Sequence, residues 1–466
     1  MDPRFRPHNT HLDGPASFRK HDPQLRLLAE QPLVHRFALL DALPKGAPGL
    51  YSLTGGRQVG KTTVLKQWMA ELLTAGTPPS RIRYLTGELV DDHHVLVRLV
   101  GEVLSEAEPG PRYLLLDEIT YVRDWDKGIK YLADTGLLDN VILVFTGSDS
   151  LILREARTRF PGRRGRSAVV DFHLPPLSFL DDVRLRGVLK PSELDTALDA
   201  RADVPRGSVR RLLEAFGSYL THGGYLTAIN DVARAERVSP STLATYSDWI
   251  RGDMLKRGKQ ERYLREVLAS VVKRQGSQVT WNALAKELSI DHPATVAEYI
   301  DLLIRMDVVN VQAALREDTL RAAPKKARKL GFRDPFIYHA VRAWLEPSPD
   351  AFGSQIQPAV ADPKLAGELA EACVASHLAR HHPTHYIKAS GEVDVAYVEG
   401  RRFRPVEVKW TGQLRPKDLQ QVARYDNGLI LTRRDQPGEI EGIPTLPLPL
   451  FLLRLGPSPV TTPEVG

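Results

Sequence analysis

Residues 51–63, which read YSLTGGRQVGKTT, constrain the fold more than any other part of the chain. They place a strand, a glycine-rich turn and a helix start in the order that phosphate binding requires. Gly55, Gly56 and Gly60 let the backbone curve around an anion, because glycine adopts conformations that other residues avoid. The segment therefore predicts a phosphate-binding loop in an α/β architecture with a parallel sheet.

This loop carries the side chains needed to bind ATP with magnesium. Lys61 is placed to reach the β- and γ-phosphates, and Thr62 is placed to ligate Mg²⁺. The residues that we assign to the nucleotide are Gly55, Gly56, Arg57, Gln58, Val59, Gly60, Lys61, Thr62 and Thr63.

A second element agrees with the loop, because the apolar run 113–116 ends in Asp117 and Glu118. Asp117 stands where a carboxylate holds the magnesium shell, and Glu118 is positioned to polarise the attacking water. The next apolar run, 141–145, is followed by TGSDS, in which Ser148 is placed to orient the water or to bond the γ-phosphate. We therefore expect ATP hydrolysis.

The segment FPGRRGR supplies Arg163, Arg164 and Arg166 in a glycine-flanked loop. One of them is a candidate to stabilise charge on a γ-phosphate; if it serves a neighbouring subunit, the protein forms a homo-oligomer. The alternative is a basic surface loop.

Composition and patterning divide the chain further. We expect a flexible arm (1–22), an ATPase domain (23–180), a helical region (181–346), a linker (347–363), an α/β domain (364–455) and a tail (456–466). The single cysteine excludes an internal disulfide framework, and no apolar run is long enough to span a bilayer. We therefore expect a cytoplasmic protein without a membrane partner.

The helical region contains a helix-turn-helix pattern. Amphipathic stretches at 281–288 and 295–306 are followed by a strand-like run, which predicts a winged helix at about 259–330. Residues 251–330 hold sixteen Lys/Arg against ten Asp/Glu, equal to the net charge of +6. This excess predicts contact with DNA or a solvated surface. The candidate DNA-binding residues are His292, Thr295, Lys325 and Lys326, and the basic run 325–329 contacts phosphates or forms a solvated hairpin.

The C-terminal domain carries Asp394 and the sequence VEVKW, which contains Glu407 and Lys409. Residues i and i+2 of a strand share a face, so Glu407 and Lys409 project together. With Asp394, they predict a second divalent metal and phosphodiester cleavage. Alternating charged and apolar residues also describe ordinary half-exposed strands, so a nuclease-like fold retained for binding or packing is the alternative.

Four stretches, GGRQVGKTT, LLLDEITYVRDW, FTGSDS and GRSAVVDFHLPPLSF, together resemble a family of bacterial and archaeal AAA-type ATPases. The resemblance implies an ATPase domain, a winged helix and a domain similar to PD-(D/E)XK nucleases. It implies metal and base roles for Asp117 and Glu118, a sensor role for Ser148, the finger role for Arg163, and a further acid at Glu371.

Two functions remain from the sequence. The first is an ATPase coupled to a DNA-associated winged-helix and nuclease-like region. The second is an ATP-dependent switch or scaffold with an inactive nuclease-like domain.

Overall fold

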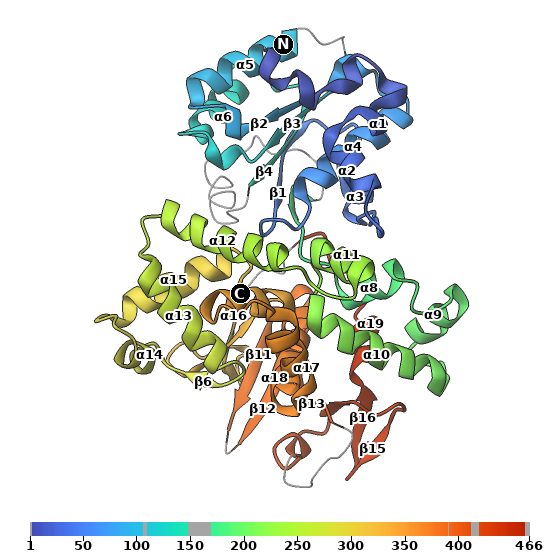
Figure 1. Ribbon diagram of the computed structural model, residues 1–466, viewed down its shortest axis with the longest axis vertical. Coiled ribbons are helices and arrows are strands. Elements are labelled where there is room, and N and C mark those ends of the chain that lie inside the picture. The colour runs from blue at the N-terminus through green and yellow to red at the C-terminus, as the bar shows by residue number, and fades with distance from the viewer. Residues whose placement is uncertain (1, 106–109, 148–168, 390, 412–418, 462–466) are drawn as a thin grey trace. The chain divides into compact units, whose positions relative to one another are not determined.

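The computed structural model describes residues 2–105, 110–147, 169–389, 391–411 and 419–461. The chain forms two compact units, Met1–Pro175 and Pro176–Gly466. The ribbon is shown in Figure 1.

Within its described residues, the first unit contains a five-stranded sheet in the order β2-β3-β4-β1-β5. Every pair of neighbouring strands is parallel. The α/β fold with a parallel sheet is therefore confirmed. The strands are β1 (Gly49–Thr54), β2 (Ile82–Thr86), β3 (Arg112–Asp117), β4 (Val141–Gly147) and β5 (Asp171–His173).

Helices cover both faces of this sheet (Figure 1). Leu114 and Leu116 pack with α5 and α6 in one hydrophobic cluster. On the opposite face, Trp68 of α4 contacts Tyr113 edge to face, with ring centroids 5.6 Å apart. Because both faces are buried, the strands are almost continuously apolar. The α-helices are α1 (Phe18–His21), α2 (Pro23–Ala29), α3 (Leu39–Ala42), α4 (Lys61–Thr74), α5 (His93–Ser105) and α6 (Trp125–Asp134).

Residues 2–22 pack against the sheet instead of forming the predicted flexible arm. Asn9 lies beside the edge strand β2, where its side chain accepts a hydrogen bond from the N–H of Tyr84 (2.9 Å) and donates one to the carbonyl of Tyr84 (2.8 Å). Phe5 is fully buried. The prediction was wrong because short 3₁₀ turns show no apolar period, although their few apolar side chains still reach a core. These turns are η1 (Pro3–His8), η2 (Thr10–Leu12) and η3 (Pro15–Ser17).

The second unit begins with a helical region, as the predicted fold class requires. Ser239 and Asp334 cap α12 and α16 by accepting hydrogen bonds from backbone N–H groups, and a proline follows each cap. The helices are α8 (Phe179–Leu185), α9 (Pro191–Leu198), α10 (Arg206–His222), α11 (Leu226–Ala235), α12 (Pro240–Lys256), α13 (Glu261–Lys273), α14 (Trp281–Glu287), α15 (Pro293–Arg305) and α16 (Pro335–Leu345).

A small antiparallel sheet accompanies α13, α14 and α15. Its strands follow the order β6-β10-β7, so β10 is central and is paired on both sides. Along the chain the elements run α13, β6, α14, α15, β7 and β10, and the short pair β8 and β9 lies between the last two. The bounds are β6 (Gln278–Val279), β7 (Val309–Ala313), β8 (Leu315–Arg316), β9 (Arg321–Ala322) and β10 (Arg328–Phe332).

The C-terminal part contains a mixed sheet of six strands among the described residues, in the order β11-β12-β13-β14-β16-β15. The long helix α18 packs against β12 and β13 (Figure 1). The elements are α18 (Pro363–His381), β11 (Thr384–Lys388), β12 (Glu392–Glu399), β13 (Arg402–Lys409), β14 (Leu429–Thr432), β15 (Gly438–Ile440), β16 (Ile443–Pro447) and α19 (Leu448–Arg454).

The segment expected to be a linker, 347–363, is also folded. It contains the π-helix η7 (Phe352–Ile356) and α17 (Gln357–Ala361), and Ile356 and Ala359 are buried. Gly353, Ser354 and Pro358, which are residue types that indicate a linker, therefore occupy short helices. The helical region and the C-terminal sheet belong to one compact unit.

Candidate functional site

The ammonium of Lys61 is held by the loop that precedes α4. Its Nζ donates hydrogen bonds to the carbonyls of Gly55 (3.1 Å) and Gly56 (2.9 Å), and it lies 3.5 Å from Oε1 of Glu118. The side chain is buried. Two of its partners are neutral carbonyls, so much of its positive charge stays available to an anion that enters the loop.

Two glycines shape this loop. Gly60 has a φ of +107° and stands immediately before α4. A Cβ atom on Gly55 would lie 2.4 Å from the carbonyl oxygen of Leu174. A larger residue at position 55 would therefore displace the backbone that follows β5.

Asp117 ends β3 and is buried. Its Oδ2 accepts hydrogen bonds from the hydroxyls of Thr62 (2.7 Å) and Tyr84 (2.5 Å). Its Oδ1 accepts a hydrogen bond from the hydroxyl of Thr146 (2.5 Å). Hydroxyl groups from α4, β2 and β4 thus fix both oxygens of the carboxylate.

Glu118 adopts a left-handed backbone conformation, with a φ of +50°. Its N–H donates to the hydroxyl of Thr146 (2.8 Å), and its Oε1 faces Lys61. Its Oε2 is buried and accepts no hydrogen bond from the described residues. A strained backbone and an open buried acceptor are features that accompany functional sites.

The structure brings together the predicted residues Lys61, Thr62, Asp117 and Glu118. The sequence reasoning missed Tyr84 and Thr146. A tyrosine within an apolar strand looks like an ordinary core residue, so Tyr84 carried no signal. Thr146 stands at the end of a strand beside the carboxylates, and that position could have identified it.

The remaining loop residues have different surroundings. Arg57 donates to the hydroxyl of Tyr121 (2.5 Å) and lies over its ring. Gln58 has a φ of +59°, and Val59 is buried. Thr63 accepts a hydrogen bond from the side chain of Gln24 in α2 (3.1 Å), so its hydroxyl is engaged away from the loop. Ser148, Arg163, Arg164 and Arg166 lie outside the described residues.

The residues present fit magnesium and a nucleotide. The hydroxyl of Thr62 and Oδ2 of Asp117 are adjacent oxygen donors, which are the type that Mg²⁺ prefers. Beside them, Lys61 and the backbone of the loop suit a polyphosphate.

In the second unit, Asp394, Glu407 and Lys409 also come together. Nζ of Lys409 lies 2.6 Å from Oε1 of Glu407 and 3.9 Å from Oδ2 of Asp394. The N–H of Val408 donates to Oδ2 of Asp394 (2.9 Å). The strand register therefore assembles this predicted trio.

Lys329 of β10 joins the same cluster. Its Nζ lies 2.5 Å from Oε1 of Glu371 and 2.6 Å from Oε1 of Glu392. It also lies 3.7 Å from Oδ1 of Asp394. The sequence placed Lys329 in a run that contacts phosphates or solvent, but the structure buries it. That prediction was wrong for Lys329 because a run of like charges does not reveal carboxylates that are distant along the chain.

The ionisation of this cluster is strongly perturbed. Burial raises the pKa of Glu371 and of Glu407, and the carboxylate of Asp394 raises both further. Burial lowers the pKa of Lys329, but the carboxylates of its partners outweigh burial and hold this pKa above its ordinary value. In the part of the chain that the structure describes, no three acid, His or Cys side chains form a group arranged to hold a metal ion. As arranged, the cluster holds the ammonium groups of Lys329 and Lys409 against its carboxylates.

The candidate DNA-binding residues lie on α15 and before β10. His292 precedes α15 and is exposed, Thr295 is half-buried, and Lys325 is exposed. Lys326 is exposed and donates to the carbonyl of Lys388 (3.2 Å).

Ion pairs also engage part of the basic window. Arg251 pairs with Glu261 (2.6 Å), Lys259 pairs with Glu298, and Arg274 pairs with Glu287. The exposed residues of α15 include Glu298 and Asp301. These acids are among the ten already counted in the window, so its net excess of Lys and Arg is unchanged, but acids stand beside the candidate DNA-binding residues.

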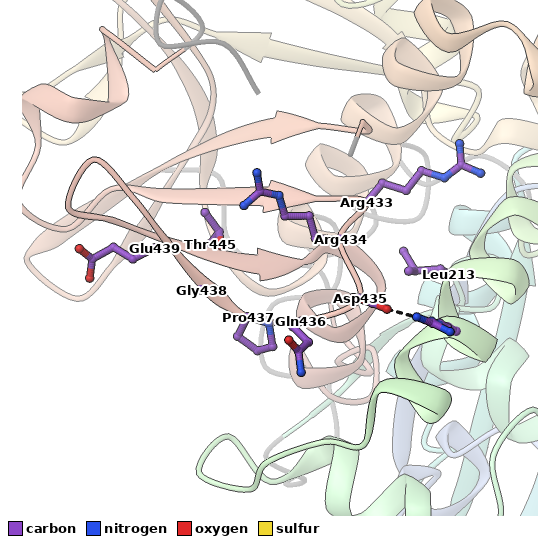
Figure 2. Close-up of a pocket in the computed structure, with 10 residues that line it drawn as sticks. Leu213, Arg433, Arg434, Asp435, Gln436, Pro437, Gly438, Glu439 and Thr445 are labelled. Carbon is purple, nitrogen blue, oxygen red and sulfur yellow. Dashed lines mark hydrogen bonds and ion pairs between the residues drawn. The ribbon is translucent and has the colours of Figure 1, made fainter. Parts of the chain in front are cut away.

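A surface hollow of about 530 Å³ lies where α10 meets the β14–β15 connection (Figure 2). Arg210 donates to Asp435 (2.8 Å) at its edge. Arg433 and Arg434 point away from each other, and Arg433 lies over the ring of Trp410. The hollow contains none of the predicted site residues.

The sequence of the nucleotide loop and its surroundings matches a known family. Residues 48–181 match the profile described as AAA domain. Over this segment the chain is similar to AAA-type P-loop ATPase domains. Residues 213–348 match a profile described only as a domain of unknown function.

Two curated relatives are uncharacterized proteins. One, from Haemophilus influenzae, is 24% identical over 265 residues, which cover 54% of this chain and 59% of the relative. The other, from Methanocaldococcus jannaschii, is 35% identical over 115 residues, which cover 23% of each. The chain thus spans less than two thirds of the length of these relatives.

A Walker-type ATPase of Pyrococcus abyssi is similar in structure, with a TM-score of 0.41 and 14% identity. The match covers 63% of this chain and 91% of that chain. No helix within the described ranges is long and apolar enough to cross a membrane.

Proposed function

We propose that the AAA-type ATPase domain hydrolyses Mg-ATP at the edge of its sheet. Lys61 neutralises the β- and γ-phosphates, and Thr62 and Asp117 hold the magnesium ion. The ion supplies charge neutralisation for the phosphates. Glu118 orients the attacking water and accepts its proton.

The observation that best supports this proposal is the arrangement of side chains where α4 meets β3. Thr62 and Asp117 are hydrogen bonded, and the next residue, Glu118, faces Lys61 with one buried oxygen open. Phosphate contact, metal ligation and water activation thereby fall within one site.

The experiment is steady-state phosphate release from ATP in the presence of Mg²⁺. Asp117→Asn should lose turnover because it weakens the metal shell. Glu102→Gln, on the surface of α5, is the matched control and should keep wild-type turnover. Full activity of Asp117→Asn would rule out this site.

For the second unit, we propose that a winged helix and a nuclease-like domain act on DNA under control of the ATPase. The element order from α13 to β10 and the trio of Asp394, Glu407 and Lys409 support this proposal. Binding is tested by fluorescence anisotropy of labelled duplex, because phosphate contacts weaken as salt rises. His292→Ala with Thr295→Ala should change sequence preference, and Lys325→Ala with Lys326→Ala should reduce the salt dependence.

A second candidate is a non-cleaving switch or scaffold that acts on a protein partner. It is favoured by the ammonium of Lys329 among the carboxylates and by the acidic exposed residues of α15. DNA nicking with Mn²⁺ separates the two. Nicking that is lost in Asp394→Ala supports the nuclease, whereas no DNA binding at low salt supports the switch. An oligomer built through Arg163 remains a proposal, for which analytical ultracentrifugation with ATP is the test.

A further inference from the structure

Lys329 differs from Lys409 because it comes from another sheet. Lys409 belongs to the same strand as Glu407, whereas Lys329 extends from β10 beside the helix-turn-helix. Only about 2% of Lys329 is exposed. Its ammonium faces three carboxylates, those of Glu371, Glu392 and Asp394.

The backbone around Lys329 is held firmly. Lys329 pairs with Gln278 of β6 on one side and with Gln312 of β7 on the other. The hydroxyl of Tyr386 in β11 donates to the carbonyl of Ala327 (2.6 Å). Because β10 is the central strand, moving the backbone of Lys329 requires the small sheet to move as a body.

The carboxylates that contact Lys329 are also groups for which a divalent metal ion can compete. Glu371, Glu392 and Asp394 are oxygen donors of the kind that bind Mg²⁺ or Mn²⁺. An ammonium held against these carboxylate oxygens disfavours a divalent ion on the same oxygens, since like charges repel at such distances. The resident ammonium is therefore positioned to compete with a metal ion.

We propose that Lys329 is an internal counter-cation that excludes divalent metal from the acidic cluster. The cluster accepts a metal ion only when the sheet that carries β10 separates from β12 and α18. The inference rests on the nuclease-like site proposed above and assigns its regulation to the helix-turn-helix region. A DNA partner that pulls this region away would then activate the site.

The test measures Mn²⁺ binding to the full chain by electron paramagnetic resonance without nucleotide. Wild type should show no site that depends on Asp394. Lys329→Met should gain one Mn²⁺ site, and the double variant Lys329→Met, Asp394→Asn should lose it. Lys364→Met, at an exposed position of α18, is the matched control and should behave as wild type.

Two results would overturn the inference. One is a wild-type Mn²⁺ site that Asp394→Asn removes, because Lys329 then excludes nothing. The other is a folded Lys329→Met that gains no site. If Lys329→Met does not fold, Lys329→Gln, which keeps a hydrogen-bond donor without the charge, replaces it in every arm.

The readout also separates this inference from the proposed cleavage. A metal site gained by Lys329→Met without DNA nicking would refute the nuclease and leave the role of Lys329 intact. DNA nicking by wild type that depends on Asp394 but not on separation of β10 would support the nuclease and refute the role of Lys329.

Discussion

Lys61 and Lys329 are both buried lysines beside carboxylates, but their surroundings prepare them for different tasks. Lys61 donates to two neutral carbonyls and has one carboxylate at 3.5 Å. Lys329 has carboxylates at 2.5, 2.6 and 3.7 Å. The first ammonium retains charge for an incoming phosphate, whereas the second is already neutralised. The partners of a buried cation therefore indicate its role better than its burial does.

Lys66 provides a third case that belongs to neither site. Its Nζ pairs with Asp22 (2.9 Å), donates to the carbonyl of His8 (2.6 Å) and lies 3.9 Å from the centre of the Tyr84 ring. This lysine ties the N-terminal segment to α4 and β2. Lys66 is therefore a structural cation, with which the surroundings of Lys61 and Lys329 can be compared.

The largest expected effect concerns the acid that faces Lys61. Glu118→Gln removes the proton acceptor but keeps the shape of the side chain, so turnover should fall by about 10²–10⁴-fold. Binding of Mg-ATP, measured by fluorescent nucleotide titration, should persist. Glu88→Gln, on an exposed turn, is the control. Equal turnover in wild type and Glu118→Gln would mean that this carboxylate only balances Lys61.

The next effect concerns the structural lysine. Asp22→Asn leaves Lys66 as a buried charge without its carboxylate, which should lower the free energy of unfolding by about 3 kcal/mol. The measurement is urea denaturation of the full chain followed by tryptophan fluorescence. Glu102→Gln breaks an exposed pair with Arg98 and should cost less than about 1 kcal/mol. Similar losses in both variants would contradict a structural role for Lys66.

The third effect concerns the affinity for Mg-ATP, which should depend on Lys61 and not on Lys329. Lys61→Met should weaken Mg-ATP binding by about 10- to 100-fold, because charged hydrogen bonds to the phosphates are lost. Lys329→Met should leave ATP affinity unchanged. Isothermal titration of both variants provides the measurement. A comparable loss of ATP affinity in Lys329→Met would show that the two lysines are not independent.

The smallest effect concerns the hydroxyl that joins the structural lysine to the ATP site. Tyr84→Phe keeps the ring over Lys66 but removes one hydrogen bond to Asp117, so turnover should fall by up to about tenfold. The magnesium concentration for half-maximal activity should rise, which a purely structural role would not cause. Tyr113→Phe, in the same sheet, is the control and should match wild type. An unchanged magnesium requirement in Tyr84→Phe would remove Tyr84 from the site.

Several features were predictable because they are local or follow from strand order. Lys61 and Thr62 stand in a continuous loop. Asp117 and Glu118 follow a buried strand, and the ends of parallel strands lie on one edge of the sheet. Glu407 and Lys409 share a face because strand residues alternate.

Other features depended on distant contacts. Nothing near Tyr84 in the sequence distinguishes it from a core tyrosine, and nothing near Lys329 distinguishes it from its exposed neighbours Lys325 and Lys326. The segment before Asp22 shows no periodicity, yet it covers an edge strand. These residues acquire their roles only where separate elements pack together.

The sequence by itself determined the nucleotide loop, the acids at the end of β3 and the fold class, because short-range geometry and alternating burial specify them. Only the tertiary structure decided which cations are neutralised. The energy of a charge depends on groups within a few ångströms in space, whatever their distance along the chain. Lys61 was therefore predictable from its own loop, and Lys329 was defined only when β10, β12 and α18 came together.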